Sequence, residues 1–318
     1  MSRVLLTGAA GFIGSHLAQA LRSRGDKVTI LDNFAPFYPR PIKQRNIQPA
    51  LDAGAQLVEG DITNSADVAQ AFSAARPDTV VHLAACAGVR PSIADPSRYA
   101  TVNVVGTQRL LDAAVERGVN RFIVASSSSV YGNNEKTPFS ETDNVSRPIS
   151  PYAATKVATE LICSAASHLH GLPITALRFF TVFGPRQRPD LAIHTFLSRV
   201  SRGEAIPVFG DGSTSRDYTY IDDIIDGVMR AIDRCGRVER FRCYNLGGER
   251  PMSLSHLIEA VEQTVGRKAV IDRRSNQPGD VTRTWADLTR SRAELGYEPR
   301  TGLVEGMRKQ WEWMQAHC

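Results

Sequence analysis

Short runs of apolar residues recur along the first half of the chain and alternate with longer segments whose apolar positions have helical spacing. The apolar runs lie at residues 3–7, 27–31, 57–58, 79–81, 121–125 and 174–177. Such runs, bounded by turn residues, are typical of strands that a parallel sheet buries on both faces. Because helical segments separate the runs, the pattern predicts an α/β fold built on a doubly wound parallel sheet.

Beyond about residue 180 the alternation becomes irregular. With 318 residues and 42% hydrophobic content, the chain is long enough for one large domain and a smaller appendage. We therefore predict a large domain over residues 1–180, to which the chain returns later, and a smaller mixed α/β lobe formed mainly by residues 181–318. The lobe is expected to cover the carboxyl edge of the sheet, where ligands of such folds bind.

A glycine-rich turn follows the first apolar run. Gly8, Gly11 and Gly14 have the spacing GxxGxxG, and a segment with helical apolar spacing comes next. In a dinucleotide-binding turn the first glycine permits the bend, the second lets the backbone approach a pyrophosphate, and the third allows close packing of helix on strand. The N-terminus of the helix then faces the phosphate charge. The order of strand, turn and helix therefore indicates a bound dinucleotide.

Asp32 directly follows the second apolar run. A carboxylate at this point accepts hydrogen bonds from both hydroxyls of an adenosine ribose. The same carboxylate would repel the 2′-phosphate of NADP. The sequence therefore predicts NAD as the cofactor.

Tyr152 and Lys156 lie four residues apart on a segment predicted to be helical, residues 152–171, and so share one face of it. A phenol with a pKa of ~10 is a poor base at neutral pH. A lysine ammonium ~4 Å away contributes about 4 kcal/mol at an effective dielectric constant of ~20, which lowers that pKa by roughly three. We therefore predict that Lys156 acidifies Tyr152, and that Tyr152 takes a hydroxyl proton while hydride leaves the same carbon.

Four consecutive serines, residues 126–129, follow the apolar run at 121–125 and precede Val130-Tyr131-Gly132. The carboxyl ends of strands line the ligand crevice in folds of this class. A serine hydroxyl in that position can hydrogen-bond the oxygen that reacts. The stretch therefore predicts a third catalytic side chain beside the tyrosine and the lysine.

These features together resemble the extended short-chain dehydrogenase/reductase family, specifically its nucleotide-sugar epimerases. The resemblance covers nearly all of the chain and implies a Rossmann-type sheet with a substrate lobe. The matching stretches are the glycine turn, Asp61-Ile62, His82-Leu83-Ala84-Ala85, Asn103, the serines before Val130-Tyr131-Gly132, Tyr152 with Lys156, Arg178 to Pro185, Val208-Phe209-Gly210, Ser215-Arg216-Asp217-Tyr218 and Pro278-Gly279-Asp280.

The resemblance implies roles for individual residues. Ser127, four residues before the tyrosine of the Val-Tyr-Gly block, is implied to contact O4 of the sugar and to act with Tyr152 and Lys156 in catalysis. Contacts with NAD are implied for Gly8, Gly11, Phe12, Ile13, Gly14, Asp32, Asn33, Asp61, Ile62, Leu83, Ala84, Ala85, Asn103, Tyr152 and Lys156. Contacts with the substrate are implied for Arg90, Ser127, Ser128, Ser129, Thr181, Arg188, Phe209, Arg216 and Asp280.

Several of these implied contacts have a specific form. Asp61-Ile62 would flank the adenine, and Asn103 would support the site from the helix behind it. Phe209 would stack on the nucleotide base, Arg216 would hold the pyrophosphate, and Asp280 would bind the nucleotide ribose. An arginine on phosphate and an aromatic ring on a base are both physically favourable pairings.

Two positions distinguish the chain from dehydratases and decarboxylases of the same family. Dehydratases carry an acidic pair directly before the Val-Tyr-Gly block, and decarboxylating relatives carry a glutamate at the second of these positions. Here the two positions are Ser128 and Ser129. Elimination or decarboxylation would lack its acid–base group, so reversible epimerisation is favoured.

Thr181 stands where epimerases of neutral hexoses commonly have asparagine, and Arg188 follows it. Together with Arg90 upstream, this stretch is similar to the uronate 4-epimerases. A substrate with a C6 carboxylate needs a cation and a hydroxyl donor, and Arg188 with Thr181 supplies both. The resemblance therefore favours a uronate substrate.

The favoured function is NAD-dependent 4-epimerisation of a UDP-sugar through a 4-keto intermediate, with UDP-glucuronate to UDP-galacturonate as first choice. The alternative is a UDP-glucose or UDP-N-acetylglucosamine 4-epimerase, for which Thr181 and the serines make room at C2 or C6. A net dehydrogenase or reductase would change NADH stoichiometrically. A non-catalytic NAD sensor would be expected to lack Tyr152 or Lys156, and both are present.

Composition and charge limit the partners and the compartment. The net charge is +5, but the arginines are dispersed and no nucleic-acid-binding signature occurs, so we predict no nucleic-acid partner. No apolar stretch reaches the ~18 residues of a membrane span, so no membrane association is predicted. The five cysteines lack metal-ligand spacing, which favours a cytoplasmic protein with reduced thiols and no metal. The resemblance also implies a homodimer built on the helices that carry Asn103 and Tyr152.

Overall fold

A seven-stranded parallel sheet forms the centre of the molecule in a computed structural model that describes residues 1–275 and 281–317. The strand order is β10-β6-β5-β4-β1-β2-β3, and it reverses between β1 and β4, the switch point at which dinucleotides bind in such sheets. The predicted doubly wound, Rossmann-type sheet is confirmed. Its strands are β1 (Arg3–Thr7), β2 (Lys27–Asp32), β3 (Gln56–Glu59), β4 (Thr79–His82), β5 (Arg121–Ser127), β6 (Ile174–Phe179) and β10 (Phe241–Leu246).

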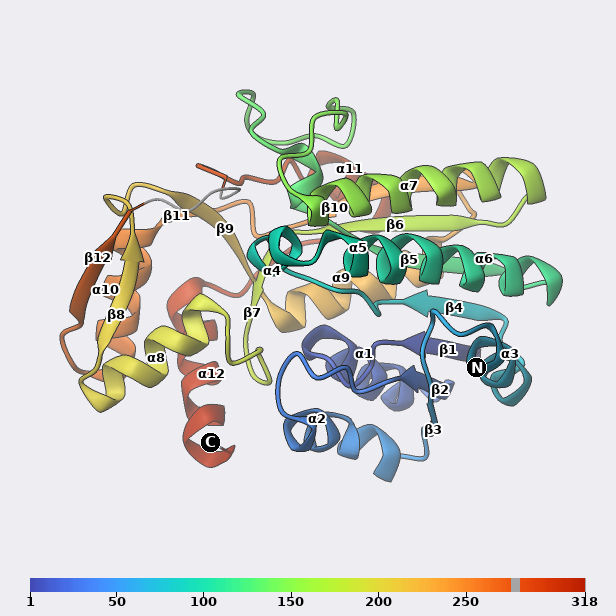
Figure 1. Ribbon diagram of the computed structural model, residues 1–318, viewed down its shortest axis with the longest axis horizontal. Coiled ribbons are helices and arrows are strands. Elements are labelled where there is room, and N and C mark those ends of the chain that lie inside the picture. The colour runs from blue at the N-terminus through green and yellow to red at the C-terminus, as the bar shows by residue number, and fades with distance from the viewer. Residues whose placement is uncertain (276–280, 318) are drawn as a thin grey trace.

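Helices cover both faces of the sheet, which is why the apolar runs are buried except at the edge strand β3, where Leu57 is exposed (Figure 1). One face carries a layer of three adjoining helices: α3 (Ser65–Ala75), α6 (Gly106–Glu116) and α7 (Pro151–His170). The other face is covered by α1 (Phe12–Ser23), α2 (Arg40–Asp52), α9 (Ile221–Arg234) and α11 (Thr289–Leu295).

The lobe begins where the chain leaves the sheet after β6. One small sheet has the order β11-β9-β7 and the other pairs β12 with β8. The strands are β7 (Thr181–Phe183), β8 (Ala205–Phe209), β9 (Ser215–Tyr220), β11 (Pro251–Ser253) and β12 (Val270–Arg274). The helices beside them are α8 (Ala192–Arg202), α10 (Leu254–Val265) and α12 (Leu303–His317). Between these segments α9 and β10 return to the large sheet, so the chain crosses between the two parts more than once (Figure 1).

Four short elements lie around the carboxyl edge of the large sheet. They are α4 (Val89–Ala94), α5 (Pro96–Ala100), the π-helical turn η1 (Thr101–Val105) and the 3-10 turn η2 (Ser128–Tyr131). Three of them follow β4 and one follows β5, the strands beside the switch point. The irregular backbone is therefore gathered at the edge of the sheet where a ligand is expected.

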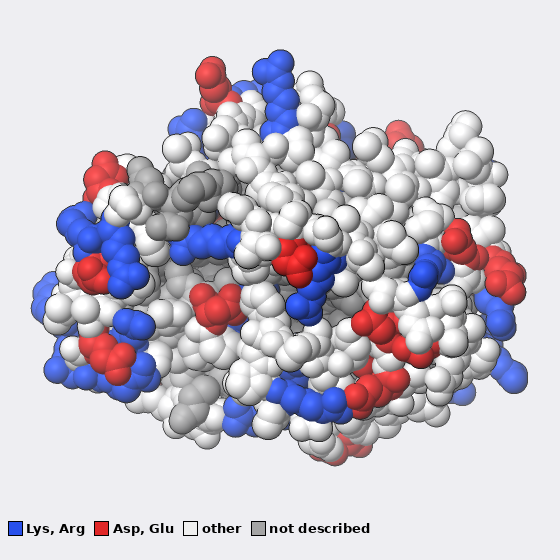
Figure 2. All heavy atoms as spheres, viewed as in Figure 1, with Lys and Arg blue, Asp and Glu red and all other residues white. Residues whose placement is uncertain are grey.

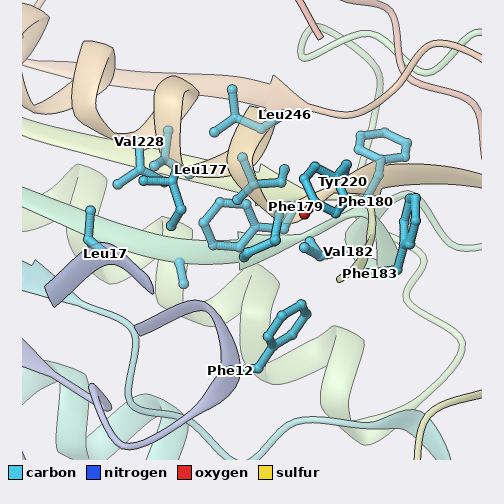
Figure 3. Close-up of a cluster of buried hydrophobic side chains, with 14 of the residues drawn as sticks. Phe12, Leu17, Leu177, Phe179, Phe180, Val182, Phe183, Tyr220, Val228 and Leu246 are labelled. Carbon is cyan, nitrogen blue, oxygen red and sulfur yellow. The ribbon is translucent and has the colours of Figure 1, made fainter. Parts of the chain in front are cut away.

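The large sheet and the lobe share one hydrophobic core. Leu177 of β6 and Val228 of α9 belong to a buried cluster that also contains Leu17 of α1 (Figure 3). The same cluster includes Phe180 and Phe183, which lie at the start of the lobe (Figure 3). Burying a side chain of this size stabilises a fold by ~1.5–3 kcal/mol. The lobe is therefore held to the sheet by continuous apolar packing.

Charged side chains of both signs are interspersed over the face seen in Figure 2, and many of them lie over β8, β12 and α10. The part of this face that lies over α7 is largely uncharged, whereas charged side chains of both signs lie over α6. Within residues 1–275 and 281–317, no helix has the length and apolar character needed to cross a membrane. The same residues contain no group of three or more side chains placed to hold a metal ion.

Candidate active site

The glycine turn after β1 depends on two glycines. Gly8 has a φ of +74°, and a Cβ there would lie 2.5 Å from the backbone nitrogen of Ala84. A Cβ on Gly14 would lie 2.3 Å from the carbonyl oxygen of Gly8. Backbone atoms line both positions, so a larger residue cannot be accommodated. Gly11 precedes α1 without a side-chain cap, which leaves the first N–H groups of this helix for a phosphate.

Asp32 ends β2 beside this turn. Its two carboxylate oxygens accept hydrogen bonds of 2.9 Å from the backbone nitrogens of Ala10 and Phe34. Burial raises the pKa of Asp32, although these hydrogen bonds and the charge of Lys43 oppose that shift. Each oxygen has more than one lone pair, so the carboxylate can also accept hydrogen bonds from ribose hydroxyls.

Asn33 and Asp61 connect the ends of β2 and β3. The side-chain nitrogen of Asn33 donates to Asp61 over 2.7 Å, and Asp61 also accepts hydrogen bonds from the backbone and hydroxyl of Thr63. Ile62 is buried, and a Cβ on Gly106 would lie 2.7 Å from its side chain, so it packs against the start of α6. Both residues predicted to flank the adenine therefore lie at the carboxyl edge of the sheet.

Asn103 holds the loop that follows β4. Its Oδ1 accepts a hydrogen bond of 2.8 Å from the backbone nitrogen of Cys86. Its Nδ2 donates to the carbonyl oxygen of Cys86 and to Oγ1 of Thr155, both over 3.0 Å. Both N–H donors of the amide are thereby used, and the residue is buried. Asn103 therefore ties the loop at Cys86 to Thr155 of α7, and its role beside a bound cofactor stays a prediction.

Tyr152 and Ser127 meet at the carboxyl end of β5. The helix α7 begins just before Tyr152, because the hydroxyl of Ser150 caps it by accepting a hydrogen bond of 3.1 Å from the backbone nitrogen of Ala153. The side chains of Ser127 and Tyr152 are hydrogen-bonded to each other. Tyr99 of α5 packs edge-on against Tyr152, with 6.1 Å between the ring centroids. The structure therefore brings two of the three predicted catalytic residues together.

Ser127 also organises the serines that follow it. Its hydroxyl donates to Oγ of Ser129 and accepts a hydrogen bond from the backbone nitrogen of Ser129, both over 3.1 Å. It thereby caps the turn η2, in which Ser128 is the first residue. Ser128 and Ser129 are partly exposed and offer hydroxyls at the two positions where dehydratases of the family carry acids.

The structure differs from the predicted acidification of Tyr152 by Lys156. The ammonium of Lys156 donates a hydrogen bond of 2.8 Å to the carbonyl oxygen of Ala125, and burial lowers the pKa of Lys156 to about 8. Burial raises the pKa of Tyr152, and the cation that opposes this shift is Arg188. The ammonium of Lys156 is therefore hydrogen-bonded to a backbone carbonyl of β5. The positive charge that acts on the phenol of Tyr152 comes instead from Arg188 of the lobe.

Arg188 approaches Tyr152 from the turn that follows β7. Its Nε and Nη2 donate to the carboxylate of Asp190 over 3.0 and 2.7 Å. A Cβ on Gly88 would lie 3.9 Å from Nη2 of Arg188, so the guanidinium lies beside the loop after β4. Thr181 is the first residue of β7, which pairs with β9. Arg188 and Tyr152, predicted to serve the same sugar, therefore face one region.

The other predicted substrate residues lie mainly on lobe strands. Phe209 ends β8, and the guanidinium of Arg90 in α4 lies 4.4 Å from the centre of its ring. Arg216 on β9 donates a hydrogen bond of 2.9 Å to the carbonyl oxygen of Ser215. Asp280 lies outside the described residues. The contact between Arg90 and Phe209 joins the loop region of the large sheet to the lobe.

A buried ion pair that the sequence analysis missed lies behind this site. Arg178 of β6 donates to both carboxylate oxygens of Glu160 over 2.8 and 2.6 Å, and to the hydroxyl of Tyr131 over 2.9 Å. The hydroxyl of Ser126 donates to Glu160 over 2.5 Å. Arg178 and Glu160 are both buried, so each charge depends on the other and on these hydrogen bonds.

The spacing of polar residues along α7 could have indicated that Glu160 belongs to the site. Glu160 follows Lys156 by four residues, as Lys156 follows Tyr152, so all three lie on one face of the helix. The negative charge of Glu160 raises the pKa of Lys156 and so favours its charged form. The network continues from Tyr131, which donates over 2.6 Å to Asn245 of β10. The catalytic helix is thereby connected to the strand that returns from the lobe.

Asp217 joins three segments of the lobe. It is fully buried and accepts hydrogen bonds from the backbone nitrogens of Gly248, Glu249 and Ala286 over 2.6, 3.0 and 2.9 Å. These contacts connect β9 to the loop after β10 and to the segment that leads into α11. Burial raises the pKa of Asp217 to about 6, although the three hydrogen bonds oppose that shift.

Replacing Asp217 with asparagine is expected to destabilise the protein by about 1–3 kcal/mol, because the amide NH₂ would face backbone N–H donors without an acceptor. The folded-state pKa lies above the unfolded value of 3.8, so wild-type stability should fall as the pH rises from about 4 to about 6. The asparagine variant has no ionisable group at this position, so its stability should lack this dependence on pH. Urea denaturation should therefore give a larger difference between the two proteins below pH ~4 than above pH ~6. A difference that does not change with pH would contradict this assignment.

Comparisons with known proteins identify the family. Residues 4–247 match the model of the NAD dependent epimerase/dehydratase family. The chain belongs to this family. It is 37% identical over 328 residues to a probable UDP-glucuronate 4-epimerase of Rhizobium meliloti (strain 1021), with 98% of this chain and 96% of the relative covered.

Solved structures of epimerases have the same fold. The UDP-glucuronic acid 4-epimerase of Bacillus cereus, solved with UDP-glucuronic acid and NAD, superposes with a TM-score of 0.90 at 36% identity, covering 98% of this chain and 99% of that one. The UDP-glucose 4-epimerase of Thermus thermophilus, solved with NAD, superposes with a TM-score of 0.90 at 31% identity, covering 99% of this chain and 100% of that one.

Membership in the family confirms the resemblance to nucleotide-sugar epimerases and the prediction of NAD as cofactor. The site fits that cofactor. The first turn of α1 has no side-chain cap, Gly8 and Gly14 leave no room for a Cβ, and Asp32 has lone pairs for ribose hydroxyls. These residues would hold the dinucleotide at the switch point of the sheet.

Proposed function

We propose that this enzyme epimerises a UDP-sugar at C4, and that its substrate is UDP-glucuronate, which it converts to UDP-galacturonate. The main support for this proposal is the position of Arg188, which is close enough to Tyr152 for its charge to lower the pKa of the phenol. A sugar whose C4 hydroxyl meets Tyr152 holds its C6 carboxylate one ring carbon away, within reach of that guanidinium. The names of the Rhizobium meliloti and Bacillus cereus relatives support the same choice.

Each catalytic side chain has a defined task in this proposal. Tyr152 takes the proton of the C4 hydroxyl, and Ser127, which is hydrogen-bonded to Tyr152, aligns the C4 oxygen. Lys156, with a pKa of about 8, remains mostly charged at neutral pH and adds positive charge to the pocket. Bound NAD accepts the C4 hydride and returns it. Phe209 and Arg216 hold the nucleotide end while the 4-keto sugar turns to present its other face.

A uronate makes the 4-keto stage hazardous. A ketone at C4 and a carboxylate on C5 form a β-keto acid, which loses carbon dioxide most readily when the carboxylate bond is perpendicular to the carbonyl plane. Arg188 and Thr181 would hold the carboxylate away from that orientation. The absence of a carboxylate at Ser128 and Ser129 removes an acid–base group from the same region. Both features favour epimerisation over decarboxylation.

Replacing Arg188 with glutamine is expected to reduce kcat/KM for UDP-glucuronate by roughly 10- to 100-fold, the loss expected when a charged hydrogen-bond partner is removed. The effect on UDP-glucose should be much smaller, because that sugar lacks the carboxylate. Steady-state kinetics with both sugars measure this difference. Arg186→Gln is a matched control, because Arg186 hydrogen-bonds Gln19. Equal losses on both sugars in the Arg188 variant would rule out a role in carboxylate binding.

The alternative is a 4-epimerase of UDP-glucose or UDP-N-acetylglucosamine. The likeness to the Thermus thermophilus enzyme favours this alternative over others, because its fold agrees equally well with this chain. Incubation with UDP-glucuronate, UDP-glucose and UDP-N-acetylglucosamine, followed by chromatography, separates the proposals. UDP-galacturonate should form fastest. Faster epimerisation of a neutral sugar would favour the alternative, and net NADH formation in proportion to product would instead indicate a dehydrogenase.

We further propose that two copies of the chain pair through α6 and α7. The surface over α7 is largely uncharged (Figure 2). Leu161 and Leu169 are exposed on one face of α7, and Val105 is exposed where η1 joins α6. Apolar side chains at helical spacing are typical of a helix–helix interface. Light scattering of the purified protein tests the pairing, since a mass near the 34.8 kDa of one chain would contradict it.

A further inference from the structure

Arg188 is held by two residues that the site assignments do not include. Its guanidinium carbon lies 4.5 Å from the centre of the Phe37 ring, a distance typical of a cation–π contact. Two of its nitrogens donate to the carboxylate of Asp190. The side chain of Arg188 is 17% exposed and that of Asp190 is 46% exposed, so the arginine lies inside and its acidic partner lies toward solvent.

The pair with Asp190 leaves part of the guanidinium free for a ligand. A guanidinium has five N–H donors, and the two hydrogen bonds to Asp190 use two of them. The guanidinium lies beside the turn at Gly88, and its charge lowers the pKa of both Tyr152 and Tyr99. The remaining donors therefore lie in the region where the proposed sugar meets its base.

The position of Phe37 is set by contacts of its own segment, which joins β2 to α2. The ammonium of Lys43 donates over 2.5 Å to the carbonyl oxygen of Ala35 and lies 4.6 Å from the centre of the Tyr38 ring. The hydroxyl of Tyr38 donates over 3.4 Å to the carbonyl oxygen of Ala10 in the glycine turn. The segment is thus tied to both α2 and the turn, and it presents Phe37 to Arg188.

We propose that Phe37 is a specificity-determining positioning residue, whose ring acts with Asp190 to hold the guanidinium of Arg188 where it pairs with the C6 carboxylate of a uronate. This inference rests on the proposed function. An arginine already held by two contacts loses little side-chain entropy when it binds a carboxylate, so its pairing with substrate is stronger. Asp32, proposed to bind the ribose of the cofactor, and Phe37, proposed to position the arginine that binds the sugar, then lie five residues apart in the sequence.

Loss of this restraint has a chemical signature. When the carboxylate of the 4-keto uronate turns perpendicular to the carbonyl, the C5–C6 bond breaks, and carbon dioxide leaves. The bonding electron pair moves toward the C4 carbonyl as an enolate, which takes a proton from solvent to give a 4-keto pentose. The uronate is then lost, and the hydride already removed from C4 is still held by the nicotinamide. The C4 ketone of the pentose can still take the hydride back, so an enzyme molecule stays in its NADH form only when the 4-keto pentose leaves the site before that return.

Phe37→Leu removes the aromatic face, and Phe37→Tyr keeps it. The ring is 40% exposed, so neither change opens a cavity in the core. For the leucine variant we expect KM for UDP-glucuronate to rise roughly 3- to 30-fold, the range of a cation–π contact converted to a ratio. We also expect a larger fraction of enzyme to become trapped with NADH during turnover, read from its near-ultraviolet absorbance. The tyrosine variant should retain wild-type values.

UDP-glucose, as a substrate or as a competitive inhibitor, serves as the comparison ligand. Its constants should be unchanged in both variants, as should the NAD content and the melting temperature. Equal changes for both sugars, or no change for UDP-glucuronate, would overturn the role of Phe37 while leaving the proposed function intact. A wild-type enzyme that does not turn over UDP-glucuronate would overturn both. Failure of the tyrosine variant to match wild type would also count against a role of the aromatic face.

Discussion

Replacing Tyr152 with phenylalanine is expected to lower kcat by roughly 10²- to 10⁴-fold, the range typical when a general base is lost. The ring would still pack against Tyr99, so the site should keep its shape. Only the hydroxyl that is hydrogen-bonded to Ser127 would be removed. Steady-state turnover of the UDP-sugar measures the effect, and the NAD content of the purified variant shows that the cofactor site is intact.

Tyr99→Phe is a matched control for this variant. Its hydroxyl donates over 3.1 Å to the carbonyl oxygen of Ala87, in the loop after β4, and has no part in the proposed proton transfer. The control should therefore retain most of the activity. Because burial raises the pKa of Tyr152, wild-type kcat/KM should increase as the pH rises toward that pKa, where the base becomes deprotonated. Turnover by Tyr152→Phe at the wild-type rate would remove the proposed base.

Replacing Arg178 with leucine is expected to destabilise the protein by about 3–5 kcal/mol, because Glu160 would keep a buried charge without its partner. The leucine also cannot donate to Tyr131, which contacts both Arg178 and Asn245. Chemical denaturation of the complete protein measures the loss. Weakening of this network should also lower activity, since Glu160 lies on the same helix face as Lys156.

The double variant Glu160→Gln/Arg178→Leu separates a charge effect from simple loss of packing. With no charge left to bury, it should recover part of the stability that the single variant loses. The exposed pair of Arg202 and Glu204 provides a surface control, and Arg202→Leu should cause no measurable loss, because solvent screens such pairs. A double variant that is less stable than Arg178→Leu would contradict the argument from buried charge.

Much of the fold could be predicted from the sequence, because six strands of the large sheet coincide with apolar runs. The seventh, β10, could not. Its sequence places Arg242 and Asn245 among apolar residues, and it joins the sheet only by pairing with β6. Arg242 forms an ion pair with Glu294, and Asn245 bonds to Tyr131, so its polar side chains are satisfied by distant residues. No local pattern contains that information.

The candidate site likewise has parts that could be predicted from the sequence and parts that could not. The glycine turn, Asp32 and the pair of Tyr152 with Lys156 are set by spacing within single elements, and they could be read from the chain. The charge near Tyr152 depends instead on long-range pairing, because β7 must pair with β9 before Arg188 can approach the phenol. The carbonyl of Ala125 that takes the ammonium of Lys156 likewise comes from another element.

The place of β10 at the edge of the sheet has a consequence for biosynthesis. A nascent chain that has emerged from the ribosome only as far as Phe179 already contains Tyr152 and Lys156, but β6 then presents an unpaired edge. Such an edge readily joins a neighbouring polypeptide. The catalytic helix also lacks its link to Asn245 until translation has passed β10. Maturation of this enzyme is therefore completed only after the ribosome has passed Leu246, well beyond the residues that carry the catalytic pair.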